Sequence, residues 1–492
     1  MKTRGLRTPA SINAILLLSI FTFVFLGVEY LYVNMMSRMV GEDQTVIAQN
    51  YALGISVLGF ILYPVLNRAV HERFKALLTF STVLVSIICI FLIQQHISYA
   101  ITLTAGLILF FLMGLFGSSA HYLAVCTIHG ERTLARLVGF AYAGGILLQY
   151  INNNLINIEI AEAVILSVFL AVLSVLFIRT RHVFRVELMG EEKTLSKALE
   201  KTNGPIQKKI TTGLLLVFLV ALMACVFSTL DNAITLGHAA GAMDIGQWPR
   251  ILLALSGLAA GFLFDIRNRK YMTLMMYCVM VFSVLCVIIL RWGGPFLTGV
   301  VIAYIASGFF VVFFTTSFLE FAACMRIPAL WAGMGRAVNN LVAALVTNSS
   351  VTLLLSGRNL TLVIFMLVLF VAVSILMFAY TTRSHTALAP PEAPATGYTP
   401  KEKFSSFASL FSLTDREQDV LQYLLVSDSS VQDIAQQMAI SRPVLYRHIS
   451  SLNEKTGTKS RIGLLQFYYE WIPEKEDAAL EKSPDFMGLR QM

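Results

Sequence analysis

Over its first 380 positions, the chain of 492 residues alternates long apolar segments with short polar ones. A helix that crosses the hydrocarbon core of a bilayer needs about 20 mostly apolar residues. Backbone groups in lipid must be hydrogen-bonded within their own segment, so we expect such segments to be helices. Twelve segments qualify: 11–36, 45–66, 74–95, 97–126, 133–153, 160–178, 210–236, 247–264, 271–290, 295–321, 328–355 and 359–380. The pattern predicts an all-α, polytopic membrane domain over residues 1–380.

Composition separates this block from the rest of the chain. Charged residues make up 13% of the whole sequence, against about 25% in an average soluble domain, which excludes a wholly soluble protein. Residues 1–380 hold 25 Lys and Arg against 15 Asp and Glu, whereas residues 381–492 hold 12 against 14. The net charge of +8 therefore arises in the membrane block and does not by itself indicate nucleic-acid binding.

The basic residues also predict an orientation, because cytoplasmic loops of membrane proteins are enriched in Lys and Arg. With a cytoplasmic N-terminus, 21 of the 25 basic residues of the membrane block lie on the cytoplasmic side. The four on the outer side are Arg38, Arg250, Arg291 and Arg358. We expect a multi-pass protein of the bacterial inner membrane, surrounded by lipid, with both termini in the cytoplasm.

A long basic segment, the predicted cytoplasmic loop 179–209, divides the block into halves 1–180 and 210–380 with six spans each. Sliding the chain on itself by 198 residues aligns Gly59 with Gly257 and Cys126 with Cys324. These coincidences and the equal span counts favour two six-helix repeats.

The segment from Gly261 to Lys270 reads GFLFDIRNRK. It resembles the Gly-x-Leu-x-Asp-x-x-Gly-Arg-Lys loop of the major facilitator superfamily, with Asn268 in place of the second Gly. The corresponding loop of the first half has Pro64 and Asn67 where a strong copy has Gly and Asp. The resemblance implies a facilitator-like fold, in which spans one, four, seven and ten line a central cavity. A generic cytoplasmic anchor explains the basic residues of this loop equally well.

Four ionisable residues lie inside these same spans: Glu29, His121, Asp231 and Glu320. Ionisable groups in a bilayer are costly and by default indicate function. We predict that they form the binding pocket of a small molecule, or a proton relay. Pairing or snorkelling near the helix ends is the alternative, above all for Asp231.

The chain shows no Ser-His-Asp, metal-ligand or phosphate-loop pattern, and its six cysteines form no C-x-x-C pair. We therefore expect no enzyme activity, no catalytic residue, no metal and no cofactor.

After residue 380 the composition changes. Residues 381–403 are rich in Pro and Ala and predict a semi-extended linker with a reach of about 70 Å. Phe404, Phe407 and Leu410 have helical spacing and predict a short helix that packs on a domain over 404–472, followed by a tail, 473–492. Membrane contact is the alternative for this helix.

The domain over 404–472 is predicted to contain four main helices. Thr414 and Glu417 form a capping box that opens the first. The second spans 431–438, the third runs from the cap Ser441 to Thr456 and stops at Gly457, and the fourth spans 461–471. Two short helices joined by the tight turn 439–440 make a helix-turn-helix, whose second helix enters the major groove of DNA.

The residues that carry a family likeness are Leu413, Thr414, Arg416, Glu417, Val420, Leu421, Ile434, Ala435, Met438, Ile440, Ser441, His448, Lys455, Gly457 and Arg461. They strongly resemble the LuxR-type DNA-binding domain, although Val444, Leu445 and Tyr446 replace the usual Thr-Val-Lys. Its partner is double-stranded DNA, which the resemblance implies for this chain.

By this resemblance, Tyr446, Arg447 and Ser450 contact bases. Arg442, Lys455 and Arg461 contact phosphates, and such contacts position the protein on DNA without reading the base sequence. A solvated helix end is the alternative for Lys455. The fourth helix carries a stripe of Ile462, Leu465 and Tyr469. In the family this helix often dimerises, so we expect a homodimer on DNA, with core packing as the alternative for the stripe.

Together these patterns predict a one-component transcription regulator. Its membrane domain senses a small molecule, and its cytoplasmic LuxR-type domain binds DNA. The alternative is a solute transporter with a regulatory tail that binds DNA or protein.

Overall fold

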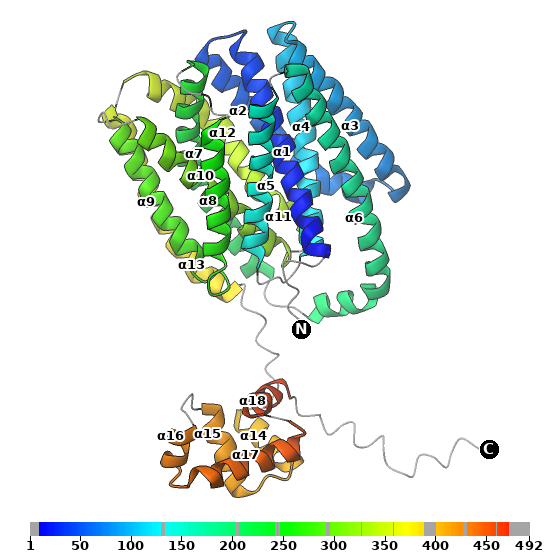
Figure 1. The fold of residues 1–492 in the computed structure, drawn as a ribbon, viewed down its shortest axis with the longest axis vertical. Coiled ribbons are helices and arrows are strands. Elements are labelled where there is room, and N and C mark those ends of the chain that lie inside the picture. The colour runs from blue at the N-terminus through cyan, green and yellow to red at the C-terminus, as the bar shows by residue number, and fades with distance from the viewer. Residues whose placement is uncertain are drawn as a thin grey trace, which may run out of the picture. The chain divides into compact units, whose positions relative to one another are not determined.

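The computed structural model describes residues 9–128, 133–156, 158–201, 206–241, 244, 247–291, 296–325, 327–357, 359–387, 400–426, 431–458 and 460–471. Every regular element within these residues is a helix, so the predicted all-α class is confirmed (Figure 1). The chain divides into two compact units, Met1–Ala389 and Pro390–Met492, which are considered separately.

The helices of the first unit are α1 (Pro9–Ser37), α2 (Glu42–Ala69), α3 (Glu72–Gln95), α4 (Tyr99–Thr127), α5 (Leu134–Leu155), α6 (Glu159–Lys201), α7 (Ile206–Ala239), α8 (Trp248–Phe264), α9 (Met272–Arg291), α10 (Phe296–Ala322), α11 (Pro328–Ala332), α12 (Met334–Leu355) and α13 (Asn359–Ala387). Among the described residues, ten helices are long and apolar enough to cross a membrane, and α8 and α9 contribute shorter apolar helices. The unit is thus a polytopic membrane domain, whereas twelve spans in two repeats stay a prediction.

Two segments differ in detail from the prediction. The segment 328–355 is not one helix, because α11 and α12 are separated at Gly333. A Cβ at Gly333 would lie 2.7 Å from the Phe60 ring, so this glycine allows α2 to approach closely. The predicted loop 179–209 is largely helical, since α6 continues to Lys201 and α7 begins at Ile206. Its Glu, Lys, Leu and Ala residues are strong helix formers, and polarity marks the end of a span rather than the end of a helix.

The two halves of the membrane domain, α1–α6 and α7–α13, meet along two seams. In one seam α5 packs against α8, and in the other α2 packs against α12. The α5/α8 seam is close because glycines line it. A Cβ on Gly139 would lie 2.8 Å from the carbonyl oxygen of Gly257, and one on Gly261 would lie 2.8 Å from that of Ala135. The two helix backbones are therefore in direct contact.

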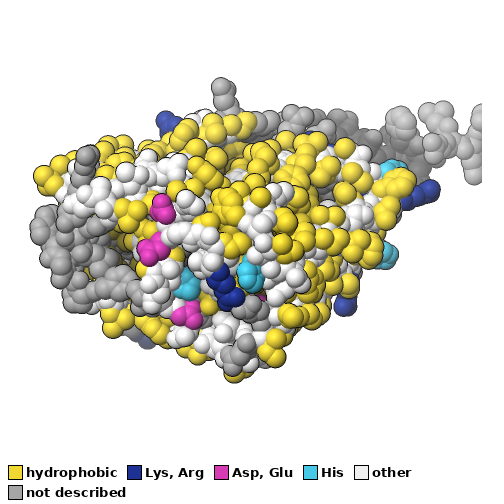
Figure 2. All heavy atoms as spheres, turned by 90° about the horizontal axis from the view of Figure 1, so that it is seen from above, with side chains coloured by type: hydrophobic (Ala, Val, Ile, Leu, Met, Phe, Trp, Pro, Cys, Tyr) yellow, Lys and Arg dark blue, Asp and Glu magenta, His cyan; other side chains and the backbone are white. Residues whose placement is uncertain are grey.

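We call the end of this bundle at which α1 begins the basal end, and the end at which α1 stops, at Ser37, the distal end. Figure 2 shows the distal end, where a few acidic, basic and histidine side chains lie near the middle of the face among hydrophobic ones. Polar contacts join α1 to the second half there. The Tyr30 hydroxyl donates to Asp244 Oδ1 at 3.1 Å, and His238 Nε2 lies 3.0 Å from Asn34 Oδ1.

The C-terminal unit contains α14 (Pro400–Leu410), α15 (Asp415–Val426), α16 (Val431–Gln437), α17 (Arg442–Thr456) and α18 (Arg461–Glu470). The predicted capping box is present. The backbone N–H of Thr414 donates to Glu417 Oε2 at 2.8 Å, and that of Glu417 donates to Thr414 Oγ1 at 3.4 Å. The tight turn between α16 and α17 contains Ala439 at φ +54°, and α17 ends at Gly457 at φ +69°, as the sequence predicts.

This unit has its own hydrophobic core. Five side chains at its centre are at most 1% exposed: Val420, Leu421, Ile434, Leu445 and Leu452. The predicted packing of α14 is also present, because Phe407 is fully buried and Phe404 is partly buried against the core, whereas Leu410 is 63% exposed. Ring centroids 4.6 to 6.1 Å from that of Phe407 belong to Phe411, Phe467, Tyr468 and Trp471. The segment α14 is therefore an integral part of the unit.

Candidate functional site

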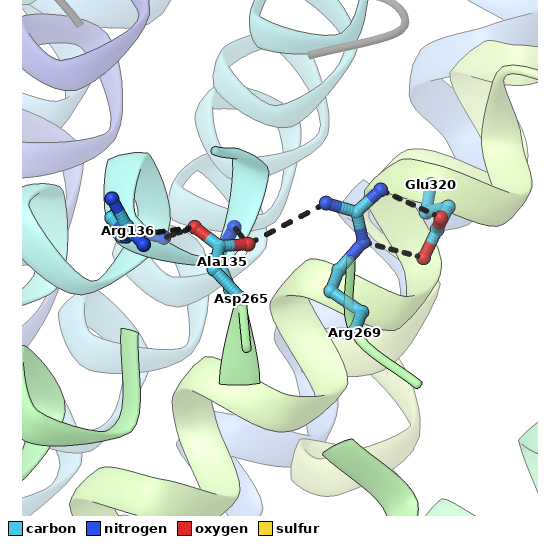
Figure 3. A network of polar contacts seen from close by, with 5 residues as sticks. All are labelled: Ala135, Arg136, Asp265, Arg269 and Glu320. Atoms are coloured by element: carbon cyan, nitrogen blue, oxygen red, sulfur yellow. Dashed lines mark hydrogen bonds and ion pairs between the residues drawn. The ribbon is translucent and has the colours of Figure 1, made fainter. Parts of the chain in front are cut away.

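A network of charges at the basal end ties the two halves together (Figure 3). Asp265 follows the last residue of α8, and its carboxylate accepts hydrogen bonds from the backbone N–H groups of Ala135 (3.1 Å) and Arg136 (2.9 Å). These donors belong to the first turn of α5, whose N–H groups have no partner within the helix. A carboxylate at a helix N-terminus also interacts favourably with the helix dipole.

The same network continues to α10. Arg269 Nη1 lies 3.5 Å from Asp265 Oδ1, and Arg269 makes a two-pronged contact with Glu320, through Nη2 at 2.9 Å and Nε at 3.2 Å. Arg267, Asn268 and Arg269 all have positive φ, between 49° and 66°, which turns the chain back toward α10. Asn tolerates this left-handed conformation better than most residues, which explains how Asn268 replaces the glycine of the facilitator loop.

The corresponding loop of the first half has a different contact. Asn67 accepts a hydrogen bond from Lys75 Nζ at 3.2 Å, and both residues belong to the same half. The α8–α9 loop thus carries a charge network that crosses between the halves, whereas this contact of Asn67 stays within its own half.

Between the halves lies a cavity of about 150 Å³ with walls from α1, α2, α5, α7, α8, α10 and α12. Glu29 on α1 and Asp231 on α7 line it, together with Arg250 on α8 and Arg336 on α12. Six aromatic side chains also line it: Phe25, Tyr30, Tyr142, Phe227, Tyr304 and Phe310. The cavity thus combines two carboxylates, two guanidinium groups and an aromatic wall.

These charges do not neutralise one another directly. Glu29 Oε1 accepts a hydrogen bond from Gln49 Nε2 at 2.7 Å. Arg336 lies over the rings of Phe25 and Phe314, 5.5 Å from each centroid. The Nε atoms of Arg250 and Arg336 are buried without a hydrogen-bond partner. Among the residues that the structure describes, neither carboxylate forms an ion pair with either arginine, so the groups remain available to a ligand.

Of the four predicted pocket residues, the structure brings Glu29 and Asp231 to one cavity but not His121 or Glu320. His121 is buried, with Nδ1 2.7 Å from the carbonyl oxygen of Gly117 and its ring edge-on to Phe21. Glu320 instead belongs to the basal network. Arg250, counted above with the outer loops, lies in α8 and is only 9% exposed, so its assignment to a loop is wrong.

In the C-terminal unit, α17 presents a polar face. Arg442, Tyr446, Arg447 and Ser450 are all exposed, Tyr446 by 56%. Residues three or four apart share a face of a helix, so this set forms one surface. The opposite face carries Leu445, Ile449 and Leu452, which are buried in the core. The four predicted DNA contacts on this helix therefore lie side by side on an accessible surface.

The other two predicted phosphate contacts differ from these four. Lys455 Nζ donates to Glu417 Oε2 at 2.7 Å and to the carbonyl oxygen of Ser412 at 2.9 Å, and Ser451 Oγ donates to Glu417 Oε1 at 2.6 Å. Lys455 is thus held by an ion pair inside the unit. Arg461 is the first residue of α18, but its side chain lies outside the described residues.

The predicted stripe of α18 is seen only in part. Leu465 is partly buried against the core, whereas the side chains of Ile462 and Tyr469 lie outside the described residues. Leu464 and Tyr468 are the residues of α18 that are buried in the core. Dimerisation through this helix stays a prediction.

Residues 411–468 match the family model of the bacterial regulatory proteins of the luxR family. The C-terminal unit is a LuxR-type domain. The exposed face of α17 lies within the matched region. No curated protein sequence matches the chain.

The membrane domain is similar to solved transporter structures. The human organic anion transporter MFSD10 (TETRAN) matches with 13% identity and a TM-score of 0.53, over 77% of this chain and 100% of that chain. A variant of the nucleoside transporter NupG matches with 13% identity and a TM-score of 0.45, over 76% and 99%. At 13% identity the MFSD10 likeness shows the fold alone: the membrane domain has a facilitator-like fold, as the loop at 261–270 predicts.

Proposed function

We propose that the chain is a membrane-bound, one-component transcription regulator of bacteria. A small molecule binds in the cavity between the halves of the membrane domain, and its binding changes how the LuxR-type domain binds DNA. One observation carries the proposal: a single chain joins a charged cavity in a transporter fold to a LuxR-type domain whose recognition face is exposed. The proposal includes an inner-membrane location with both termini in the cytoplasm, since the tail must reach the chromosome.

On the DNA side, Tyr446, Arg447 and Ser450 contact bases. Arginine recognises the acceptor pair of guanine with two hydrogen bonds, worth about 1–3 kcal/mol of discrimination. Arg442 and Arg461 contact phosphates, which adds affinity for any sequence. Two copies bind paired half-sites through α18, as helix-turn-helix dimers do.

On the sensing side, the cavity walls come from both halves, so a ligand that fills it contacts both at once. A ligand shifts a conformational equilibrium only as far as it binds one state better than the other. A change in how the halves meet alters the contacts of both seams and of the basal network. These elements supply the two arrangements that the ligand selects between.

The direct test measures DNA retention by the full-length protein in lipid nanodiscs, using fragments of the chromosome that encodes it. We expect discrete fragments to be retained, and Arg447→Ala to lower their binding about 5- to 150-fold. Arg416→Ala is the matched control, because Arg416 is an exposed arginine on α15 with a side chain 75% exposed. Retention of no fragment, or equal loss in both variants, contradicts the proposal.

The second candidate function is solute transport with a regulatory tail. It is favoured by the similarity of the membrane domain to the whole of one solved transporter chain. Uptake into vesicles that contain the purified protein distinguishes the two. A flux that Arg447→Ala leaves unchanged, without selective DNA retention, supports the transporter.

A further inference from the structure

The charged groups around the cavity come from both halves of the membrane domain and from both seams. The two carboxylates face it from opposite halves, Glu29 from α1 and Asp231 from α7. The two guanidinium groups come from the two seams, Arg250 from α8 in the α5/α8 seam and Arg336 from α12 in the α2/α12 seam. All four groups line this one cavity.

The two arginines have the properties of an anion-binding site. A guanidinium stays charged under all physiological conditions, so burial cannot neutralise it. Arg250 is more than nine-tenths buried, and its Nε, like that of Arg336, has no hydrogen-bond partner. Leaving such a donor unpaired in a protein interior is costly. A carboxylate satisfies it, because its two oxygens match the planar fork of an arginine.

Asp231 has the properties of a cation-binding group. Its side chain keeps accessible surface in the cavity, and it forms no hydrogen bond and no ion pair with any residue that the structure describes. Glu29, by contrast, already accepts a hydrogen bond from Gln49. An ammonium group provides three donors and a positive charge, which are what an unpaired carboxylate lacks.

Size and wall chemistry limit the rest of the ligand. An apolar cavity of about 150 Å³ holds a single benzene ring, and this cavity has that volume. Its aromatic residues offer ring faces and edges to an apolar or aromatic group. The body of the ligand is therefore one ring, or a branched aliphatic group of similar size, attached to its charged groups.

We infer that the cavity binds a small zwitterion, with a carboxylate held by Arg250 and Arg336, an ammonium group held by Asp231, and a body of about one ring. This inference deepens the proposed function and rests on it only in taking the cavity as the sensing site. A pure anion leaves Asp231 unpaired beside a like charge, and a pure cation leaves both arginines unpaired. A zwitterion satisfies both and connects groups from the two halves and the two seams.

The test uses the purified full-length protein in lipid nanodiscs and three probes of equal body: L-phenylalanine, 3-phenylpropionate, which lacks the ammonium group, and phenethylamine, which lacks the carboxylate. Dissociation constants are measured by calorimetry in the absence of DNA. We expect L-phenylalanine to bind at least about tenfold more tightly than either analogue, since charge-assisted hydrogen bonds are worth about 1.5–3 kcal/mol and 1.4 kcal/mol is tenfold.

Variants locate each charge. Asp231→Asn should weaken the binding of L-phenylalanine about tenfold or more and leave the binding of 3-phenylpropionate unchanged. Arg250→Gln should weaken the binding of L-phenylalanine and of 3-phenylpropionate, and leave the binding of phenethylamine unchanged. The matched controls are Glu42→Gln and Arg68→Gln, which alter exposed residues at the two ends of α2 and should change none of the three constants. The probe comparison on the unaltered protein stands even if a variant fails to fold.

The inference is overturned if none of the three probes binds at about 10 mM, a concentration that reveals contacts worth about 3 kcal/mol, or if all three bind equally. It is also overturned if Asp231→Asn weakens the binding of 3-phenylpropionate as much as the binding of L-phenylalanine. DNA retention measured with and without L-phenylalanine separates this inference from the proposed function. Selective binding of the zwitterion with no effect on DNA supports the cavity assignment and contradicts the regulatory proposal alone.

Discussion

Replacing Glu417 by Gln should destabilise the LuxR-type domain in a way that depends on pH. This carboxylate connects α15 to α17, because it accepts hydrogen bonds from the backbone N–H of Thr414 (2.8 Å), Ser451 Oγ (2.6 Å) and Lys455 Nζ (2.7 Å). Its side chain is only 6% exposed. A neutral amide keeps the shape but loses the charge on which these contacts depend.

The pKa gives the size of the effect. Burial acts to raise the pKa of Glu417, but the hydrogen bonds from Lys455, Ser451 and Thr414 outweigh it and lower the pKa from 4.5 to about 2. Each unit of pKa corresponds to 1.36 kcal/mol, so the ionised carboxylate contributes about 3 kcal/mol to the free energy of unfolding at pH 7. Because the folded pKa lies below the unfolded one, this contribution is complete above about pH 5 and is lost as the pH falls through about 2.

The assay is urea denaturation of a fragment over residues 400–471, which contains the whole core of the C-terminal unit, followed by circular dichroism. We expect Glu417→Gln to lower the free energy of unfolding by about 3 kcal/mol at pH 7, and by less than half of that at pH 3. Asp419→Asn is the control. Asp419 pairs with Arg416 at 3.9 Å, and both side chains are more than half exposed, so the control should cost less than about 1 kcal/mol.

A difference of equal size at pH 7 and pH 3 would refute this reasoning, because a change in packing does not titrate. An effect of Glu417→Gln no larger than that of Asp419→Asn would refute it as well.

Three further changes test other parts of the chain. Phe407→Ala should lower the free energy of unfolding of the same fragment by about 3–5 kcal/mol, whereas Leu410→Ala, at a side chain 63% exposed, should change it by less than about 0.5 kcal/mol. Lys455→Gln should also destabilise the fragment, by at least about 1 kcal/mol, because it leaves a buried carboxylate without its ion-pair partner. An unchanged urea midpoint would contradict this and would favour the role of Lys455 as a phosphate contact. Glu320→Gln breaks the two-pronged ion pair with Arg269 and should lower the thermal midpoint of the full-length protein, measured by tryptophan fluorescence; an unchanged midpoint would mean that the basal network does not hold the halves together.

Local features of the C-terminal domain could be predicted from the sequence, because short-range chemistry decides them. The capping box at Thr414 and the stop at Gly457 depend on residues within one helical turn, and the buried positions follow the helical period. The pairing of Lys455 with Glu417 could not be predicted, since it joins residues far apart in the sequence that only the fold brings together. A basic residue at the end of a recognition helix has the same sequence pattern whether it binds phosphate or a carboxylate of its own domain.

In the membrane domain, hydropathy located the apolar segments but not the charges that matter most. Glu29 and Asp231 stood out as acids inside spans, and both line the cavity. Arg250 and Arg336 did not, because the rule for orientation treats basic residues as loop markers. The test used for acids asks whether the residue lies inside an apolar span. Applied to arginines, it would have found Arg250 within 247–264 and Arg336 within 328–355. Glu320 could not be separated from the cavity acids, because its partner Arg269 is close only in the fold.

The helix α13 extends to Ala387 and α14 begins at Pro400, so both ends of the predicted linker belong to folded units. A chain advances at most about 3.3–3.6 Å per residue, which limits the separation of these two ends to about 45 Å. Under the proposed function, the regulator cannot leave the membrane to search the nucleoid. Its operator must instead come to the bilayer. The motion of the chromosome and the distance of the gene from the cell envelope therefore set how often the domain binds its operator.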